Sequence, residues 1–287
     1  MAIPPADGAF FTAYDTVLRT RWPATTVSTT VPTPYGPTHV NSHGPEDGPP
    51  VILLPGGGAT STVWFATAAE LGRTHRVHAV DLIGDPGRSV PGSDDPPVRA
   101  VADLMAWLDA VMDGLGTKTA SLCGHSYGAW TALHYAVHRP DRLATLVLLD
   151  PTNCFSGFSP RYLLRAAPLL LRPTPARTRA FLRWETGGVP LDETWLALER
   201  HTAAFPAARP VTGPRPETAA LRVPTLLLLA ERSRAHDVRR AAAAARKVPA
   251  VRVEILPGAT HHTLPLASPP GTDARVAEFL RARPLQA

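Results

Sequence analysis

The chain has 287 residues, of which 44% are hydrophobic, and it carries a formal net charge of +5. This length accommodates one sizeable hydrophobic core with an inserted subdomain, or two small domains. The positive residues are scattered arginines rather than a basic stripe or a known binding module, so we expect no nucleic-acid partner.

Targeting and redox signals predict a cytoplasmic protein. The two cysteines, Cys123 and Cys154, are too few for a disulfide framework, and neither lies in a metal-ligand spacing. The first 20 residues lack a basic segment followed by an apolar run, so we expect no secretory signal. No apolar run reaches the roughly 18 to 20 residues of a membrane-spanning helix. We therefore expect a protein in a reduced compartment, with no metal site and no membrane contact.

Short apolar runs alternate along the chain with segments of helical composition. The runs rich in Val, Ile and Leu are residues 51–54, 76–81, 119–123, 143–149, 225–230 and 251–256. The helical segments between them are residues 61–71, 98–115, 127–139 and 235–247. A weaker, Thr-rich segment at 27–39 is expected to start the sheet in antiparallel orientation. Strands that are apolar throughout are typically buried on both faces. The pattern therefore predicts an α/β fold with a mostly parallel sheet flanked by helices.

The alternation breaks at residues 151–221. Three short helical segments, separated by Pro and Gly, are expected there: 163–171, 176–184 and 193–202. We predict a helical cap inserted into a core formed by residues 1–150 and 222–287. The segment carries seven of the chain's 19 aromatic residues (6 Trp, 5 Tyr and 8 Phe): Phe155, Phe158, Tyr162, Phe181, Trp184, Trp195 and Phe205. These side chains could line a lid over an apolar pocket or pack the insertion onto the core, and the sequence leaves both open.

The sharpest chemical signal is Gly124-His125-Ser126-Tyr127-Gly128, where the strand at 119–123 meets the helix at 127–139. A serine on such a tight turn is forced into a strained backbone conformation, and the flanking glycines remove side chains that would collide there. Its hydroxyl then projects above the carboxyl edge of the sheet, at the positive end of the following helix. We therefore predict that Ser126 is a nucleophile.

A second Gly-rich turn, Leu54-Pro55-Gly56-Gly57-Gly58, ends the first parallel strand. Such a turn lets backbone N–H groups approach a substrate closely, which suits an oxyanion hole. The predicted donors are the amides of Gly57 and Tyr127. Losing one such donor typically costs about 3 to 4 kcal/mol of transition-state stabilisation.

The base must be one of eleven histidines. Most of them lie on expected helices or in early loops, away from the carboxyl end of a strand. His261 and His262 follow the last expected strand and come late in the chain, as the base does in the order nucleophile, acid, base. Of the two, we predict that His261 is the base.

From the Gly56 turn to the His261 loop, the chain resembles the α/β-hydrolase superfamily. Within it, two segments look like those of bacterial carboxylesterases of the naproxen-esterase-like group: Val80-Asp81-Leu82-Ile83-Gly84-Asp85 and Ala102-Asp103-Leu104-Met105-Ala106-Trp107-Leu108-Asp109. Enzymes of this kind hydrolyse carboxylic esters without a cofactor. The resemblance implies roles for Ser126 and His261 and for the amides of Gly57 and Tyr127. We expect the substrate to be a small, apolar ester.

The acid departs from the family pattern. In the superfamily it usually lies about four residues beyond the seventh strand of the sheet, where this chain has Ser233. Three carboxylates could replace it: Asp237 in the same loop or helix start, Asp150 after the strand at 143–149, and Glu231. We place Asp237 slightly ahead of Asp150 because it preserves the usual chain order, and Glu231 third.

The leading functional hypothesis is an esterase that forms an acyl-enzyme on a serine. A second hypothesis is a non-hydrolytic enzyme on the same scaffold, such as a lyase, a cyclase or an acyl transferase of secondary metabolism. A third is a ligand-binding protein with a degenerate triad, because fold alone does not specify function. The sequence does not indicate the substrate or the oligomeric state.

Overall fold

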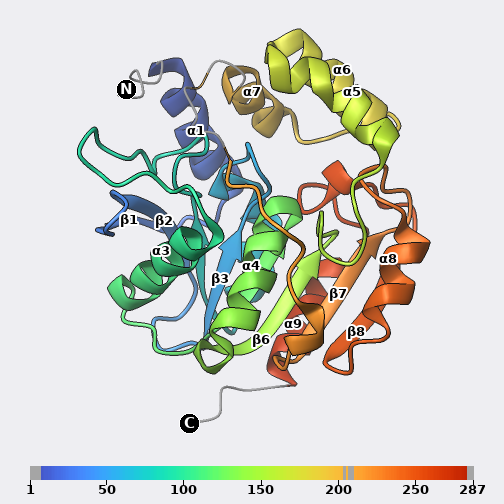
Figure 1. Cartoon of the computed structure of the whole chain (residues 1–287). Helices are drawn as coiled ribbons and strands as arrows, with labels where there is room; N and C mark the ends of the chain where they lie inside the picture. Colours follow the sequence, from blue (N-terminus) through green and yellow to red (C-terminus); the bar gives the residue numbers. More distant parts are fainter. Residues whose placement is uncertain (1–7, 203–204, 206–209, 283–287) are drawn as a thin grey trace.

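A single eight-stranded sheet runs through the centre of the molecule (Figure 1). The computed structural model describes residues 8–202, 205 and 210–282. The strands follow the spatial order β1-β2-β4-β3-β5-β6-β7-β8. Their bounds are β1 (Val27–Val31), β2 (Thr38–His43), β3 (Pro50–Leu54), β4 (Arg76–Val80), β5 (Ala120–His125), β6 (Leu143–Leu149), β7 (Thr225–Ala230) and β8 (Val251–Leu256).

The sheet is mixed only at its β1 end. Strands β1 and β2 are antiparallel to each other, and β2 is antiparallel to β4. All other neighbouring pairs are parallel. The predicted α/β fold with a mostly parallel sheet is confirmed, and the Thr-rich segment expected at 27–39 forms two antiparallel strands that reach His43.

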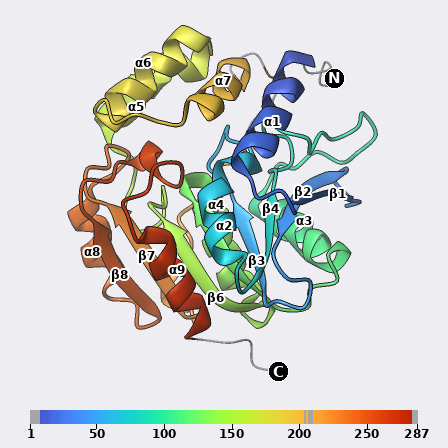
Figure 2. The ribbon, with the colours of Figure 1, turned by 180° about the vertical axis from the view of Figure 1, so that it is seen from behind.

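Helices cover both faces of the sheet. They are α1 (Gly8–Arg21), α2 (Phe65–Leu71), α3 (Val101–Gly114), α4 (Ser126–His138), α8 (Val238–Ala245) and α9 (Thr272–Arg281). Figure 1 shows α3, α4 and α8 on the near face, and the reverse view in Figure 2 shows α2 and α9 on the other. The sequence did not predict α1 and α9. Within the described residues, no helix is both long enough and apolar enough to cross a membrane.

Each face of the sheet has its own hydrophobic core, and β3 contributes to both. Ile52 and Leu54 pack with side chains of α3, α4 and α8. Val51 and Leu53 point to the opposite face and pack with α2 and α9. All four side chains are fully buried, because successive side chains of a strand alternate between two faces that are both covered.

The segment at 151–221 forms three helices between β6 and β7: α5 (Pro160–Leu171), α6 (Pro175–Thr186) and α7 (Glu193–Thr202). They lie together at one end of the molecule (Figure 1). Pro160 and Pro175 occupy first-turn positions of α5 and α6, where the missing N–H of proline costs no hydrogen bond. Helix α7 packs against α1, and Arg21 forms an ion pair of 2.7 Å with Asp192.

Helix α4 approaches β3 so closely that only glycine fits at position 128. A Cβ at Gly128 would overlap the carbonyl oxygens of Leu54 and Pro55. Both are backbone atoms at the end of β3, so they cannot rotate away as a flexible side chain would. This contact fixes where α4 begins relative to the sheet.

We therefore expect Gly128→Ala to lower the free energy of unfolding by about 3 kcal/mol or more, because the added methyl group forces backbone apart. Gly8→Ala is the matched control, since a Cβ at Gly8 meets nothing within 4 Å. Guanidinium unfolding of both variants measures the difference. Equal stability of Gly128→Ala and the wild type would contradict the packing described for α4.

Candidate active site

Ser126 lies on a turn with no loop residue between strand and helix. Strand β5 ends at His125 and α4 begins at Ser126, whose φ is 52° in the left-handed region. A Cβ at Gly124 would lie 2.5 Å from the carbonyl oxygen of Gly128, so glycine is required on this side as well. The strained serine and its flanking glycines match the turn predicted from the sequence. The hydroxyl of Ser126 therefore sits at the amino end of α4, where negative charge is favoured.

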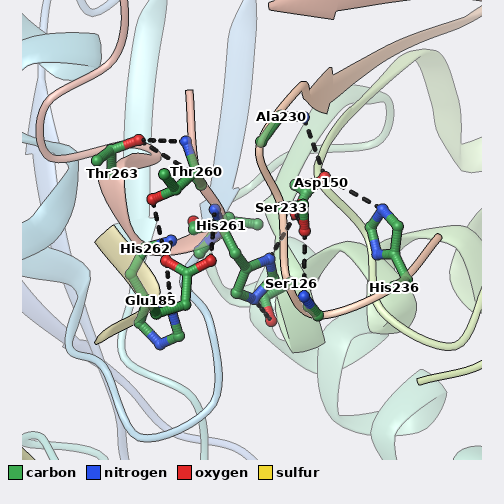
Figure 3. A network of polar contacts seen from close by, with 12 residues as sticks. Ser126, Asp150, Glu185, Ala230, Ser233, His236, Thr260, His261, His262 and Thr263 are labelled. Carbon is green, nitrogen blue, oxygen red and sulfur yellow. Dashed lines mark hydrogen bonds and ion pairs between the residues drawn. The ribbon is translucent and has the colours of Figure 1, made fainter. Parts of the chain in front are cut away.

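His261 joins this serine to a buried carboxylate. It lies in the 3₁₀ turn His261–Thr263 that follows β8, and its side chain is buried. Its Nε2 lies 2.8 Å from Ser126 Oγ, and its Nδ1 lies 2.7 Å from Asp150 Oδ2 (Figure 3). An ionised carboxylate can only accept, so Nδ1–H donates to Asp150 and Nε2 accepts from the serine hydroxyl.

Asp150 directly follows β6 and is fully buried. Its Oδ1 accepts from the N–H of Ala230 at 3.0 Å, and its Oδ2 accepts from Ser233 Oγ at 2.7 Å. Burial alone would raise the pKa of this carboxyl. The charge and close contact of His236, followed by the hydrogen bond and charge of His261, outweigh burial and hold the pKa of Asp150 well below its usual range. Asp150 is therefore ionised at neutral pH.

The structure does not bring the other two candidate acids to His261. Asp237 caps α8, and its Oδ1 accepts from the N–H of Arg240 at 3.0 Å. Glu231 is exposed and accepts from the N–H of Gly258 at 2.8 Å. This corrects the order in which the sequence analysis placed the acids. By residue 237 the chain after β7 has already turned into a helix, whereas Asp150 lies at the adjacent strand end.

Two residues beside these groups were not predicted. His236 Nε2 lies 3.3 Å from Asp150 Oδ1. Burial acts to lower the pKa of His236, but the Asp150 charge and contact outweigh it and raise that pKa. Glu185, from the end of α6, is buried against the turn that carries His261. Neither belongs to a recognisable sequence motif, and the place of its segment in the fold cannot be read from the neighbouring residues.

The turn that holds Gly57 lies directly against Ser126 and Tyr127. A Cβ on Gly56 would be 3.3 Å from Ser126 Cβ, and one on Gly57 would be 3.4 Å from Tyr127 Cβ. Tyr127 is in the first turn of α4, where N–H groups have no partner within the helix. Gly57 is exposed. The two amides predicted as oxyanion donors thus lie on neighbouring segments beside the serine.

Asp85 is hydrogen-bonded to the backbone of this turn. Its Oδ2 accepts from the N–H of Gly58 at 3.1 Å, and its side chain is 8% exposed. Burial raises the pKa of Asp85 to about 6, with a further increase from the charge of Asp81, while the Gly58 N–H acts to lower it.

In the part of the chain that the structure describes, no group of three or more His, Cys, Asp or Glu side chains could hold a metal ion.

Comparisons with known proteins agree with this architecture. Residues 51–278 match the model of a family described as the alpha/beta hydrolase family. The chain belongs to the alpha/beta hydrolase family. The carboxylesterase YbfK of Bacillus subtilis is 30% identical to this hydrolase-family chain, over 94% of this chain and 93% of the relative. The uncharacterized carboxylesterase nap of the same organism is 28% identical, over 91% and 89% of the two chains.

Two solved structures from Bacillus subtilis are similar along almost their whole length. The carboxylesterase CesB (YbfK) superposes with a TM-score of 0.87 at 28% identity, covering 95% of this chain and 97% of the other. Naproxen esterase (carboxylesterase NP) also superposes with a TM-score of 0.87, at 27% identity, covering 96% and 99%. The predicted resemblance to bacterial carboxylesterases of the naproxen-esterase-like group is confirmed.

The carboxyl of Asp85 gives a test of pH-dependent stability. Its folded pKa of about 6 exceeds its ordinary value of 3.8, so the native state keeps a proton that the unfolded state loses in this range. Stability is therefore lost as pH rises from about 4 to about 6, by up to about 3 kcal/mol. Asp85→Asn keeps an oxygen acceptor for Gly58 but cannot ionise. We expect this variant to match the wild type at pH 4 and to exceed its unfolding free energy at pH 8. Parallel pH curves for both proteins would contradict this.

Proposed function

We propose that the chain is a carboxylic ester hydrolase with Ser126 as nucleophile, His261 as base and Asp150 as acid. The observation that carries this proposal is the continuous hydrogen-bond chain of 2.8 Å and 2.7 Å through the two ring nitrogens of His261. Both distances are within hydrogen-bond reach, which is the first requirement for proton transfer. The similarity to carboxylesterases along nearly the whole chain supports an ester as substrate.

In the first half-reaction, Ser126 Oγ attacks the ester carbonyl carbon while its proton passes to His261 Nε2. The carbonyl oxygen becomes an oxyanion and accepts hydrogen bonds from the amides of Gly57 and Tyr127. The charge of Asp150 stabilises the imidazolium at this stage. As the tetrahedral intermediate collapses, Nε2–H gives the proton to the leaving alkoxide. An alcohol departs, and the acyl group stays bound to the serine.

In the second half-reaction, water takes the place of the alcohol. His261 Nε2 accepts a proton from the water as its oxygen attacks the acyl carbon, and the same oxyanion donors stabilise the second tetrahedral intermediate. The proton then returns to Ser126 Oγ as the carboxylic acid leaves. One ester and one water thus give one acid and one alcohol, and the serine hydroxyl is restored.

Aromatic side chains of the insertion support an apolar substrate and a role for residues 151–221 as a cap. The Tyr162 ring lies 6.1 Å from the His261 ring, and Phe181 and Trp184 lie 5.3 and 6.3 Å from Tyr162. By contrast, Trp195 packs in a core cluster and Phe205 contacts Phe10. These contacts support a cap role for Tyr162, Phe181 and Trp184 and a packing role for Trp195 and Phe205.

The first test is hydrolysis of a chain-length series of p-nitrophenyl esters, together with labelling by a fluorophosphonate. We expect a covalent adduct that disappears in Ser126→Ala, with a loss of kcat/KM of at least about 10⁴-fold in that variant. Labelling should also fall in His261→Ala but survive in His262→Ala, because only the former removes the ring bonded to the serine. Absence of labelling in the wild type would favour the binding-protein hypothesis. An acyl product other than the free acid would favour a non-hydrolytic enzyme.

The second test concerns the acid. Asp150→Asn should lower kcat by roughly 10⁴-fold, because the amide cannot hold the imidazole in the required tautomer or stabilise its cation. Asp237→Asn is the control: asparagine caps a helix about as well as aspartate, so this variant should keep its stability and leave kcat within about twofold.

Ser233 allows a rescue of the same acid. Its Oγ lies 2.7 Å from Asp150 Oδ2, the same oxygen that lies 2.7 Å from His261 Nδ1. A carboxylate at position 233 would therefore lie near Nδ1 of His261. Adding Ser233→Asp to Asp150→Asn should therefore recover part of the lost rate. A larger loss in Asp237→Asn than in Asp150→Asn would overturn the assignment of the acid.

A further inference from the structure

One carboxylate of the insertion is buried against the turn that carries His261. Glu185 lies in the last turn of α6 and has 0% of its surface exposed. An ionised side chain is rarely buried this completely unless it is fully hydrogen-bonded. Its partners come from a segment more than 70 positions away in the sequence, so they reflect the tertiary fold and not local capping.

Three donors of the turn converge on this carboxylate (Figure 3). Oε1 accepts from the backbone N–H of His261 at 3.1 Å. Oε2 accepts from Thr260 Oγ1 at 3.0 Å and from the backbone N–H of His262 at 2.9 Å. His262 Nδ1 also lies 3.4 Å from Oε2. Both carboxylate oxygens are thus used to fix consecutive residues of one turn.

The backbone of His261 is consequently held on both sides. Its N–H donates to Glu185, and its carbonyl oxygen lies 3.0 Å from Nε2 of His125, the residue that precedes Ser126. The carbonyl can only accept, so His125 donates. Burial, together with the charges of His261 and His262, lowers the pKa of His125 to about 3, so this ring is neutral. The turn is therefore fastened both to the segment that carries the serine and to the insertion.

We propose that Glu185 is a positioning residue that holds the Thr260–Thr263 turn in the register that points His261 Nε2 at Ser126. This rests on the proposed function, because it assigns Glu185 a part in the same reaction without contact to the substrate. Rates of positioned reactions are sensitive to displacements of about 1 Å.

The charge state of Glu185 suits this role. Burial acts to raise the pKa of its carboxyl, but the side chain and charge of His262, the charge of His261 and the backbone amide of His262 lower it to about 2. Glu185 therefore offers acceptors on both oxygens across the neutral range. If α6 moved away from the turn, the three donors of the turn would lose their acceptor on Glu185. The position of α6 and the orientation of the His261 ring are therefore coupled.

The variant Glu185→Gln tests whether Glu185 acts through its hydrogen bonds or only through the volume of its side chain. Glutamine has nearly the same size, but its amide presents one acceptor and one NH₂ group to three converging donors. At least one of the three bonds must break in either orientation of the amide. The matched control is Asp192→Asn in the same insertion, since Asp192 accepts from the backbone N–H of Trp195 at 2.9 Å and pairs with Arg21. That control loosens the insertion without touching the turn.

The readouts are kcat and KM for a p-nitrophenyl ester and the rate of fluorophosphonate labelling. We expect Glu185→Gln to lower kcat and the labelling rate by about 10- to 100-fold, with KM changed by less than about threefold. Asp192→Asn should lower the melting temperature but leave kcat within about twofold. A kcat in Glu185→Gln within twofold of the wild type, or an equal loss in Asp192→Asn, overturns the proposal.

Hydrogen–deuterium exchange distinguishes failure of this inference from failure of the proposed function. If wild type neither hydrolyses esters nor forms the adduct, the proposed function fails, yet amide exchange still reports on the turn. Glu185→Gln should speed exchange of the amide of His261, of His262 or of both by at least about tenfold, and unchanged exchange at both contradicts the inference. If Glu185→Gln does not fold, Thr260→Val removes one donor and Thr260→Ser keeps it. Equal kcat in these two variants overturns the proposal.

Discussion

The parallel sheet is the constraint on which the site depends. Four neighbouring parallel strands, β3, β5, β6 and β7, end at the same edge, and β8 follows beside β7. The residues of the candidate site follow these ends within a few positions: Ser126 and Asp150 directly follow β5 and β6, and Gly57 and His261 lie in the loops after β3 and β8. Groups separated by more than 100 positions in sequence thus meet within hydrogen-bond distance. Ligands in open α/β sheets bind at this edge for the same reason.

The sequence predicted best those features that depend only on neighbouring residues. Apolar runs identified six parallel strands, and the Gly124–Gly128 motif located the serine, because glycine spacing around a strained residue is readable from neighbours alone. The choice of acid was not local. Asp150 and Asp237 both follow strands, and only the path of the chain after β7 shows that one reaches His261 while the other caps a helix. Helix α1 was missed, although Phe10, Tyr14 and Val17 are spaced as on one face of a helix and are its buried side chains.

Two buried carboxylates, Asp150 and Glu185, contact His261 at different places. Asp150 contacts the ring of His261, whereas Glu185 contacts its backbone. Each carboxylate is satisfied by several donors, which offsets the desolvation that burial imposes. Ser233, at the position where the resemblance led us to expect the acid, donates a hydrogen bond from its hydroxyl to Asp150.

Strands β6 and β7 pair directly, although the whole insertion lies between them in the chain. The two ends of the insertion therefore leave the sheet from adjacent strands and lie close together. Closing such a loop becomes only slowly more costly as it lengthens. The intervening segment can therefore differ in length without shifting the register of any strand. Any such change has to keep Glu185 in place, because its carboxylate accepts three hydrogen bonds from the turn that carries His261.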